Sequence, residues 1–242
     1  MSKSGNRADS GASLGAVPLR ADKIGAASQM LSIEARQKLA LIASIRHFSA
    51  GETLFHEGDE AAFIFNIISG VAKSYSFLPD GREVIQAFLF ANDLIGPLGG
   101  ERFVNTVKAI TPVVAYTLPL PALVKLLRAD PGLQWQFLIK ACHELRQAQQ
   151  HAIALSQNSA KQRLLMLFNL LRLHNEPLGA SAGHIQLPMP RTDIADYTGL
   201  AVETVSRALH QLQREGVIRL ISQQCIEITD ESSFAAALAV EI

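Results

Sequence analysis

The sequence has few cysteines and no long apolar run, and each shortage removes a class of protein. Only Cys142 and Cys225 are cysteines, and they are far apart in a chain that we expect to be cytoplasmic. A structural disulfide is therefore not expected, and two thiols cannot supply the four ligands of an ordinary iron–sulfur cluster. No run approaches the roughly 20 apolar residues of a membrane span, so no membrane contact is expected.

The sequence also has no excess of either charge. Lys and Arg number 22, Asp and Glu number 22, and the net charge is zero. This balance argues neither for nor against a nucleic-acid partner, because non-specific DNA affinity would depend on local Lys and Arg rather than on a basic whole. Since 48% of the 242 residues are apolar, most of the chain is globular and long enough for two small domains. Residues 1–25, rich in Ser, Gly and Ala, are predicted to be a disordered tail.

Motifs of the common enzyme classes are missing as well. Ser69 precedes Gly70 without the surroundings of a nucleophile elbow, and no Ser, His and Asp follow a recognisable order. Gly99 and Gly100 lack the Gly-Lys-Ser/Thr of a phosphate-binding loop. We therefore expect that the protein is not an enzyme.

The most informative segment that is present runs from Arg191 to Ile218. An amphipathic stretch leads to Gly199, and a second one follows with its apolar residues on one face: Val202, Val205, Leu209 and Leu212. Two short helices joined by a Gly-containing turn make a helix-turn-helix, whose second helix enters the DNA major groove. A helical hairpin that does not bind DNA gives the same pattern, so the segments next to Arg191–Ile218 must distinguish the two interpretations. One neighbour is a predicted winged hairpin, Val217–Ser222 and Cys225–Thr229, which turns at Gln223-Gln224.

Upstream, residues 26–130 are predicted to form a β jelly-roll domain. Met30–Ile45 has helical periodicity, and after it come short β-favouring runs separated by turn residues. The predicted strands are Ala62–Ile68, Val71–Phe77, Val84–Phe90 and Val113–Leu118. With the helices that follow, the fold class is α+β.

A long helix is predicted over residues 131–158. Its apolar residues are spaced 3, 4, 3, 4, 3, which is a heptad seam: Leu138, Ala141, Leu145, Ala148, Ala152 and Leu155. This seam favours a homodimer interface, and the alternative is an ordinary core helix against the barrel. Asn158 and Ser159 interrupt the seam before a further helix, Gln162–His174, so the DNA-binding domain is placed at 159–242.

The segment Phe48 to Gly96 resembles the sensor barrel of the Crp/Fnr family of bacterial transcription regulators. The matching pieces are Gly51, Glu57-Gly58-Asp59, Ser69-Gly70, Asp80-Gly81-Arg82-Glu83 and Asp93-Leu94-Ile95-Gly96. The resemblance covers about residues 30 to 230 and includes the helix-turn-helix. It implies a homodimer that pairs through the long helix, binds double-stranded DNA as a palindrome and contacts RNA polymerase. Many relatives carry a Gly in the wing turn, where this chain has none.

The resemblance also says what the barrel lacks. Pro97 stands where cAMP-binding members carry a glutamate, Phe103-Val104 where they carry Arg-Ser, and Ala148-Gln149 where a Thr-Ser pair contacts adenine. A buried cyclic phosphate would have no guanidinium to pair with, and Arg102 is one residue out of register. We therefore expect neither cAMP nor an iron–sulfur cluster. Haem stays open, with four candidate ligands: His47, His56, His143 and His151.

Three residues of the second helix are predicted to read bases. The pattern Glu203-x-x-Ser206-Arg207 is similar to that of the Fnr branch, whose half-site is TTGA. Arg207 can donate twice to a guanine, Glu203 can accept from a cytosine amino group, and Ser206 can contact thymine or phosphate. Backbone phosphates are expected at Arg191, Thr192 and Thr204. The alternative is that Glu203 and Arg207 form only an i,i+4 surface salt bridge.

Two further interpretations remain open from the sequence. Cys225 in the wing is either an oxidation switch beside the DNA or a small buried hydrophobe. The whole chain is similar to FixK-like members, which lack the cluster cysteines, and this implies an activator of oxygen-limited metabolism such as microoxic respiration, denitrification or nitrogen fixation. The rival function is a ligand-binding regulatory subunit that controls a partner protein.

Overall fold

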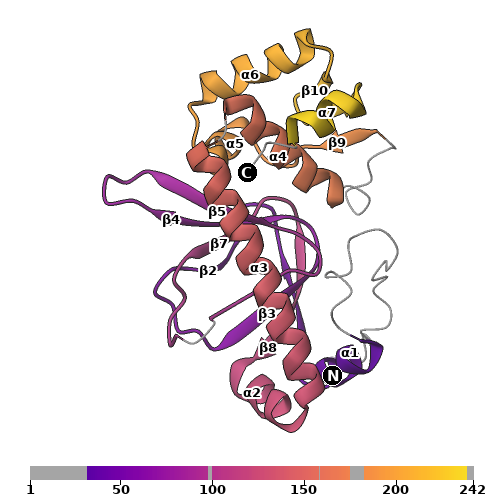
Figure 1. Ribbon diagram of the computed structural model, residues 1–242. Coiled ribbons are helices and arrows are strands. Elements are labelled where there is room, and N and C mark those ends of the chain that lie inside the picture. Colours follow the sequence, from indigo (N-terminus) through magenta and orange to yellow (C-terminus); the bar gives the residue numbers. More distant parts are fainter. Residues whose placement is uncertain (1–31, 98–99, 158, 175–182, 239–242) are drawn as a thin grey trace, which may run out of the picture.

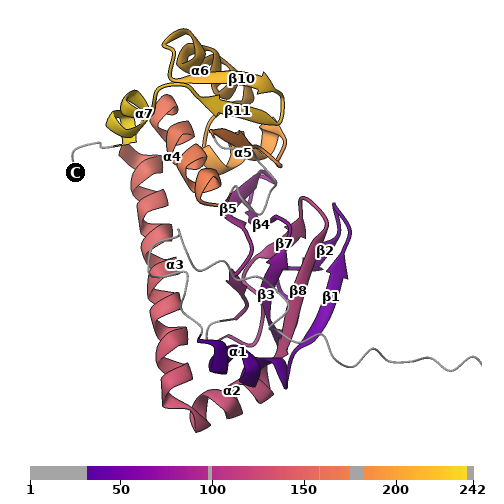
Figure 2. The same ribbon diagram turned by 90° about the vertical axis from the view of Figure 1, so that its right-hand side faces the viewer.

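A computed structural model describes residues 32–97, 100–157, 159–174 and 183–238. Two parts, an N-terminal barrel and a C-terminal domain, are joined by one long helix that runs beside the barrel (Figures 1 and 2). The predicted α+β class is confirmed. The tail predicted at 1–25 lies outside the described residues, and the predicted domain boundaries stay predictions.

The barrel consists of two four-stranded antiparallel sheets. The first has the order β1 (Ser44–Phe48), β8 (Val113–Pro119), β3 (Phe63–Ser69), β6 (Leu94–Ile95). The second has the order β2 (Thr53–Phe55), β7 (Thr106–Ala109), β4 (Ala72–Phe77), β5 (Glu83–Leu89). The four strands predicted from the sequence are confirmed to within one residue at each end.

Apolar side chains fill the space between the two sheets. Phe65 of β3 lies 5.6 Å from Phe55 of β2, measured between ring centroids, and Phe55 stacks on Phe103 at 3.7 Å. At the turn between β3 and β4, Gly70 has a φ of +91° and approaches the Pro112 carbonyl so closely that no Cβ would fit. The glycine of the predicted Ser69-Gly70 turn is therefore required by both backbone conformation and space.

Three helices cover one end and one side of the barrel: α1 (Ile33–Ala40), α2 (Leu120–Ala129) and α3 (Pro131–Gln157). The Ser32 hydroxyl caps α1 by accepting from the Ala35 N–H at 3.1 Å. The prediction of one helix over Met30–Ile45 is wrong at its C-terminal end, because Ser44 and Ile45 begin β1 and Ile45 pairs with Tyr116 of β8. A β-branched residue with a strand beside it is more stable in the sheet.

The C-terminal domain begins with α4 (Ala160–Leu173), which starts at a complete capping box between Ser159 and Gln162. The remaining elements are β9 (His184–Gln186), α5 (Arg191–Thr198), α6 (Val202–Arg214), β10 (Ile218–Ser222), β11 (Cys225–Ile228) and α7 (Glu231–Leu238). Strands β10, β11 and β9 form a three-stranded antiparallel sheet. The predicted winged hairpin is confirmed, with β9 added at its edge.

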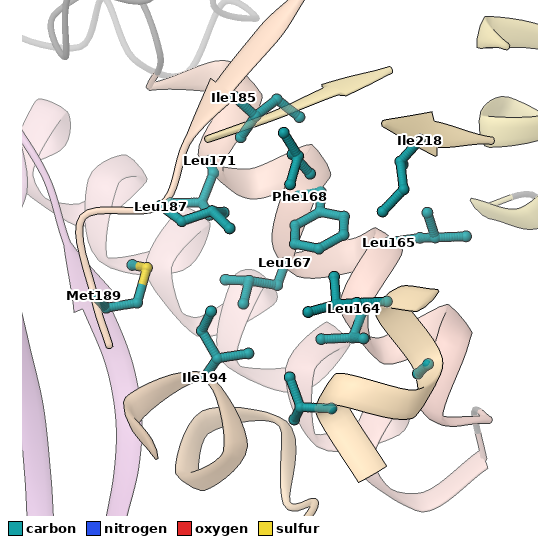
Figure 3. Close-up of a cluster of buried hydrophobic side chains, with 14 of the residues drawn as sticks. Leu164, Leu165, Leu167, Phe168, Leu171, Ile185, Leu187, Met189, Ile194 and Ile218 are labelled. Carbon is teal, nitrogen blue, oxygen red and sulfur yellow. The ribbon is translucent and has the colours of Figure 1, made fainter. Parts of the chain in front are cut away.

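One hydrophobic core runs through both parts of the molecule. Its C-terminal share centres on α4, whose Leu164, Leu167 and Phe168 meet Ile194 of α5 and Ile218 of β10 (Figure 3). The same cluster of buried side chains continues into the barrel through residues on β4, on β5 and beside them: Val71, Tyr75, Ile85, Phe88 and Phe90. The barrel is therefore packed directly against the C-terminal domain.

Candidate nucleic-acid interface

The helix-turn-helix consists of α5 and α6 with a sharp turn between them. Gly199 closes α5 in the left-handed region, at φ +63°, and the Leu200 N–H donates to the Ala195 carbonyl at 3.0 Å. The apolar side of α6 is buried against α4 and α5 through Val205, Ala208, Leu209 and Leu212. The opposite side of α6 faces outward at the end of the molecule farthest from α1 and α2 (Figures 1 and 2).

The predicted base-reading residues lie together on that outward side. Glu203 and Arg207 are exposed and Ser206 is half-buried. The Arg207 Nη2 donates to the Thr204 hydroxyl at 3.2 Å, one turn back along the helix. Within the described part of the chain Arg207 and Glu203 form no ion pair with each other. The guanidinium and the carboxylate are therefore both available to an incoming partner.

Sequence reasoning missed two further residues on this side. His210 and Arg214 are exposed, and with Glu203 and Arg207 they are spaced 4, 3, 4 along α6. That spacing places all four side chains on one face of a helix. The helical periodicity that predicted the buried face of α6 also predicts that His210 and Arg214 lie on its opposite face.

Of the predicted backbone-contact residues, Arg191 and Thr192 begin α5, and Thr204 lies in the first turn of α6. Thr192 is exposed and Thr204 is half-buried. Arg191 is half-buried, burial lowers its pKa, and its Nη1 has no hydrogen-bond partner among the described residues. The contact of Arg191, Thr192 and Thr204 with phosphates stays a prediction.

Cys225 begins strand β11 of the wing and is half-buried. The Gln186 amide donates toward its Sγ at 3.9 Å. Burial first, and the Glu227 carboxylate second, raise the pKa of the Cys225 thiol. Both cysteines are free thiols, and the other, Cys142, is exposed on α3.

The predicted seam lies along α3 and is largely uncovered. Leu138 and Leu145 are exposed, the latter by 60%, and Ala148 and Ala152 are exposed with them. Ala141 and Leu155 are half-buried at the edge of this stripe. Trp135 and Ile153 are exposed as well, so the exposed apolar side of α3 is wider than the predicted seam.

The barrel interior does not fit a cyclic nucleotide. Phe103 stands where the family motif has its Arg, and it is buried against the Phe55 ring. Val104 is 79% exposed, and the Arg102 guanidinium donates outside the barrel to the Gly58 carbonyl at 2.6 Å. The motif positions of the Arg-Ser pair are therefore taken by a buried aromatic ring and an exposed valine, neither of which can donate to a cyclic phosphate, and the absence of cAMP stays a prediction.

The four histidines proposed for haem lie in different places. His47 and His56 are exposed on the barrel, whereas His143 and His151 are half-buried on α3. The His151 ring stacks on the Tyr197 ring of α5 at 4.1 Å between centroids. Among the described residues the structure brings no two of these four into a cluster of metal-ligating side chains.

Comparison with known proteins identifies both parts of the chain. Residues 45–130 match the cyclic nucleotide-binding domain, and residues 162–237 match the Crp-like helix-turn-helix domain. No helix among the described residues has the length and apolar character to cross a membrane.

Similar proteins share most of their length with this chain. The nitrogen fixation regulation protein FixK of Bradyrhizobium diazoefficiens is 34% identical over 72% of this chain and 74% of its own. The transcriptional activator protein FnrA of Stutzerimonas stutzeri is 31% identical over 79% of each. The solved structure of FixK2 from Bradyrhizobium japonicum superposes with a TM-score of 0.77 at 27% identity, covering 83% of this chain and all of that one. The chain therefore belongs to the Crp/Fnr family and is a DNA-binding transcription regulator.

Proposed function

We propose that the protein binds a TTGA-N6-TCAA-like palindrome as a homodimer and activates genes of oxygen-limited metabolism. The observation that carries the proposal is the set of polar side chains on the outward face of α6: Glu203, Ser206 and Arg207. Helix α6 occupies the position of a recognition helix, and these residues lie in its first turns, where side chains reach base edges.

The chemistry of the three side chains suits that half-site. Arg207 presents a planar fork of donors that matches O6 and N7 of a guanine. Glu203 accepts from the amino group of the cytosine in a G·C pair, and Ser206 contacts a thymine or a phosphate. His210 and Arg214 extend the same face toward the DNA backbone, which positions the helix without specifying sequence.

A palindrome requires a second copy of the recognition helix. The exposed apolar stripe of α3 supports pairing of two chains along this helix, because heptad-spaced apolar residues bury themselves by packing against a partner helix. A two-fold dimer presents two α6 helices to successive major grooves about 34 Å apart. As an activator, the protein would contact RNA polymerase. Both the protein and its DNA would then lie in the cytoplasm.

The barrel works without a cyclic nucleotide in this proposal. The stacked Phe55 and Phe103 rings support that view, as does the outward-facing Arg102. The sequence has too few cysteines for an iron–sulfur cluster. Haem stays open, because a single axial histidine can hold the iron and four candidate histidines are present. Regulation then comes through the amount of protein or through a signal that reaches the barrel surface.

The regulated process is inferred from relatives. Similar proteins are named as a regulator of nitrogen fixation and as transcriptional activators. We infer the same branch for this chain, with microoxic respiration, denitrification or nitrogen fixation as the switched processes.

Footprinting of the purified protein on a TTGA-N6-TCAA duplex, with no added ligand, tests the proposal. We expect protection of both half-sites and at least a tenfold preference over a duplex in which each G·C pair of the half-sites is replaced by A·T. Equal binding to both duplexes would contradict the sequence assignment. No binding to either would favour a regulatory subunit that acts on a partner protein.

A further inference from the structure

A half-buried lysine of the barrel is bonded to the first helix of the DNA-binding motif. The Lys73 ammonium of β4 lies 3.0 Å from Oδ1 of Asp193 on α5 and 2.5 Å from Oε1 of Glu83 on β5. The Asp193 residue is only 7% exposed, and Lys73 is half-buried. The bond joins residues 120 positions apart in the sequence.

Lys73 and Asp193 each compensate the charge of the other. Burial by itself lowers the pKa of Lys73, but the hydrogen bonds to Glu83 and Asp193 outweigh burial and the net shift is upward. The ammonium therefore stays charged. A buried carboxylate that lost it would keep an uncompensated charge, so Asp193 has a strong preference for the one position where Lys73 reaches it.

The bond fixes one end of α5, and an aromatic contact fixes the other. Tyr197, one turn after Asp193, has its ring 4.9 Å from the Phe88 ring of the barrel, measured between centroids. These two rings are tilted by 39° and make a non-directional apolar contact, whereas a charged hydrogen bond has a defined distance and direction. Of the two contacts, the Lys73 bond is the one that sets the orientation of α5.

Helix α5 lies between the barrel and α6 (Figure 1). Its contacts with β5 on one side and α6 on the other make it the link through which the barrel meets the recognition helix. A tilt of α5 would be transmitted to α6, since Ile194 of α5 is buried in the same core as Val205 and Leu209.

We propose that Lys73 is a positioning residue for DNA recognition, which acts through Asp193 to fix the orientation of α6 relative to the barrel and α3. This inference rests on the proposed function.

Asp196 lies beside Glu83 and Asp193, and oxygens of the three carboxylates fall within 4.8 Å of one another. The Lys73 ammonium already bonds two of them, so this cluster belongs to the interdomain bond.

The role of Lys73 is distinct from that of the base-reading residues. Arg207 determines which base is preferred within a half-site, but the angle of α6 to the dimer axis determines which separation of half-sites fits. Loss of Lys73 should therefore relax the preference for the N6 spacer and leave the affinity for one half-site unchanged.

The test compares full-length wild type with Lys73→Met, which keeps most of the length of the side chain and removes its charge. Gel shifts use duplexes with N5, N6 and N7 spacers and a duplex with one TTGA half-site. We expect the wild type to prefer N6 at least tenfold, and Lys73→Met to lose most of this preference with unchanged half-site affinity. Lys73→Arg should restore it, and Lys125→Met, an exposed lysine of α2, should behave as wild type.

An unchanged N6 preference in Lys73→Met would overturn the inference. If this variant does not fold, Asp193→Asn provides the same test from the other side of the bond. If the wild type fails to bind any TTGA duplex, the proposed function is wrong. A measurement without DNA then tests whether Lys73 fixes the orientation of α6.

That measurement uses nitroxide labels at Arg128 of α2 and Gln213 of α6, both exposed, in a chain with both cysteines changed to Ser and diluted into unlabelled protein. The distance distribution between the labels should be narrow when Lys73 is present, and Lys73→Met should broaden it. Equal distributions with and without Lys73 would show that the orientation of α6 has another origin.

Discussion

The imidazole of His174 lies flat on the phenyl ring of Phe90, with 4.2 Å between centroids and 8° between planes. His174 is the C-cap of α4, and Phe90 follows β5 of the barrel. Burial first, and the Lys140 ammonium second, lower the pKa of His174 to about 4. The stacked imidazole is therefore neutral at pH 7.

This contact predicts a pH dependence of stability. In the unfolded chain the histidine has a pKa of 6.5. The contribution of this histidine to the free energy of unfolding is complete above pH 6.5 and is lost as the pH falls toward 4. The reason is that the unfolded chain binds the proton at a higher pH than the folded protein does. The loss is on the order of 1–3 kcal/mol. Urea unfolding of wild type and His174→Gln at pH 7.5 and 5 checks this. A loss of the same size in both proteins would contradict it.

Arg207→Ala should weaken binding to the TTGA palindrome by roughly 1–3 kcal/mol and abolish the preference at the guanine. The guanidinium makes only one bond within the described part of the protein, to Thr204, so folding should be unaffected. Gel shifts on duplexes with each base at that position measure the preference, with Lys125→Ala as the control. An equal loss on every duplex would mean that Arg207 contacts phosphate alone.

Leu145→Asp should convert the proposed dimer to a monomer. Leu145 is 60% exposed on α3, and a carboxylate facing its counterpart on a partner helix would be desolvated beside a like charge. Sedimentation gives the oligomeric state, and binding to the palindrome should fall at least tenfold. Val104→Asp, at an exposed apolar residue of the barrel, is the matched control and should stay dimeric. A dimeric Leu145→Asp would exclude this seam.

Hydrogen peroxide should leave DNA binding unchanged. The raised pKa of Cys225 keeps the thiol protonated at pH 7, and the thiolate is the form that reacts. Gel shifts before and after peroxide treatment, for wild type and Cys225→Ser, measure this. A loss of binding that occurs in wild type and is absent in Cys225→Ser would instead establish an oxidation switch in the wing.

Gly70 and Gly81 allow two causes of instability in an alanine variant to be compared: an unfavourable positive φ and a steric clash of the added Cβ. Gly70 and Gly81 both have positive φ, but a Cβ at Gly70 would lie 2.1 Å from the Pro112 oxygen, whereas none of the neighbours of Gly81 comes within 4 Å. Gly81→Ala should cost about 1 kcal/mol in the free energy of unfolding, and Gly70→Ala clearly more. Denaturant unfolding of both variants gives the difference. Equal losses would mean that the β3–β4 turn relaxes freely.

Local patterns in the sequence were enough to predict most elements. The helical periodicity around Gly199 predicted α5 and α6, and the β-favouring run Val71–Phe77 between two turns predicted β4. Short strands such as β2 and β7 were missed, because three or four residues hold too little pattern and are stabilised by pairing across the barrel. Helices α2 and α7 were missed too, since α2 begins at a Leu-Pro pair and α7 has a run of small alanines, which hold little contrast between faces.

The candidate site was predicted only in part, for a related reason. Glu203, Ser206 and Arg207 follow from their order along one helix. The bond between Lys73 and Asp193 could not be predicted, because it depends on how two parts of the chain that are 120 residues apart pack together. Neither residue belongs to a local motif that marks it.

The exposed side of α3 also gives the protein a built-in optical reporter. Trp135 is the one tryptophan of the sequence and is 61% exposed at the first turns of that helix. An indole in water emits at longer wavelength than one that is covered by apolar side chains. Dilution of the unlabelled protein should therefore shift its emission to the red at the concentration where two chains separate, and the dissociation constant of the assembly can be read from fluorescence alone.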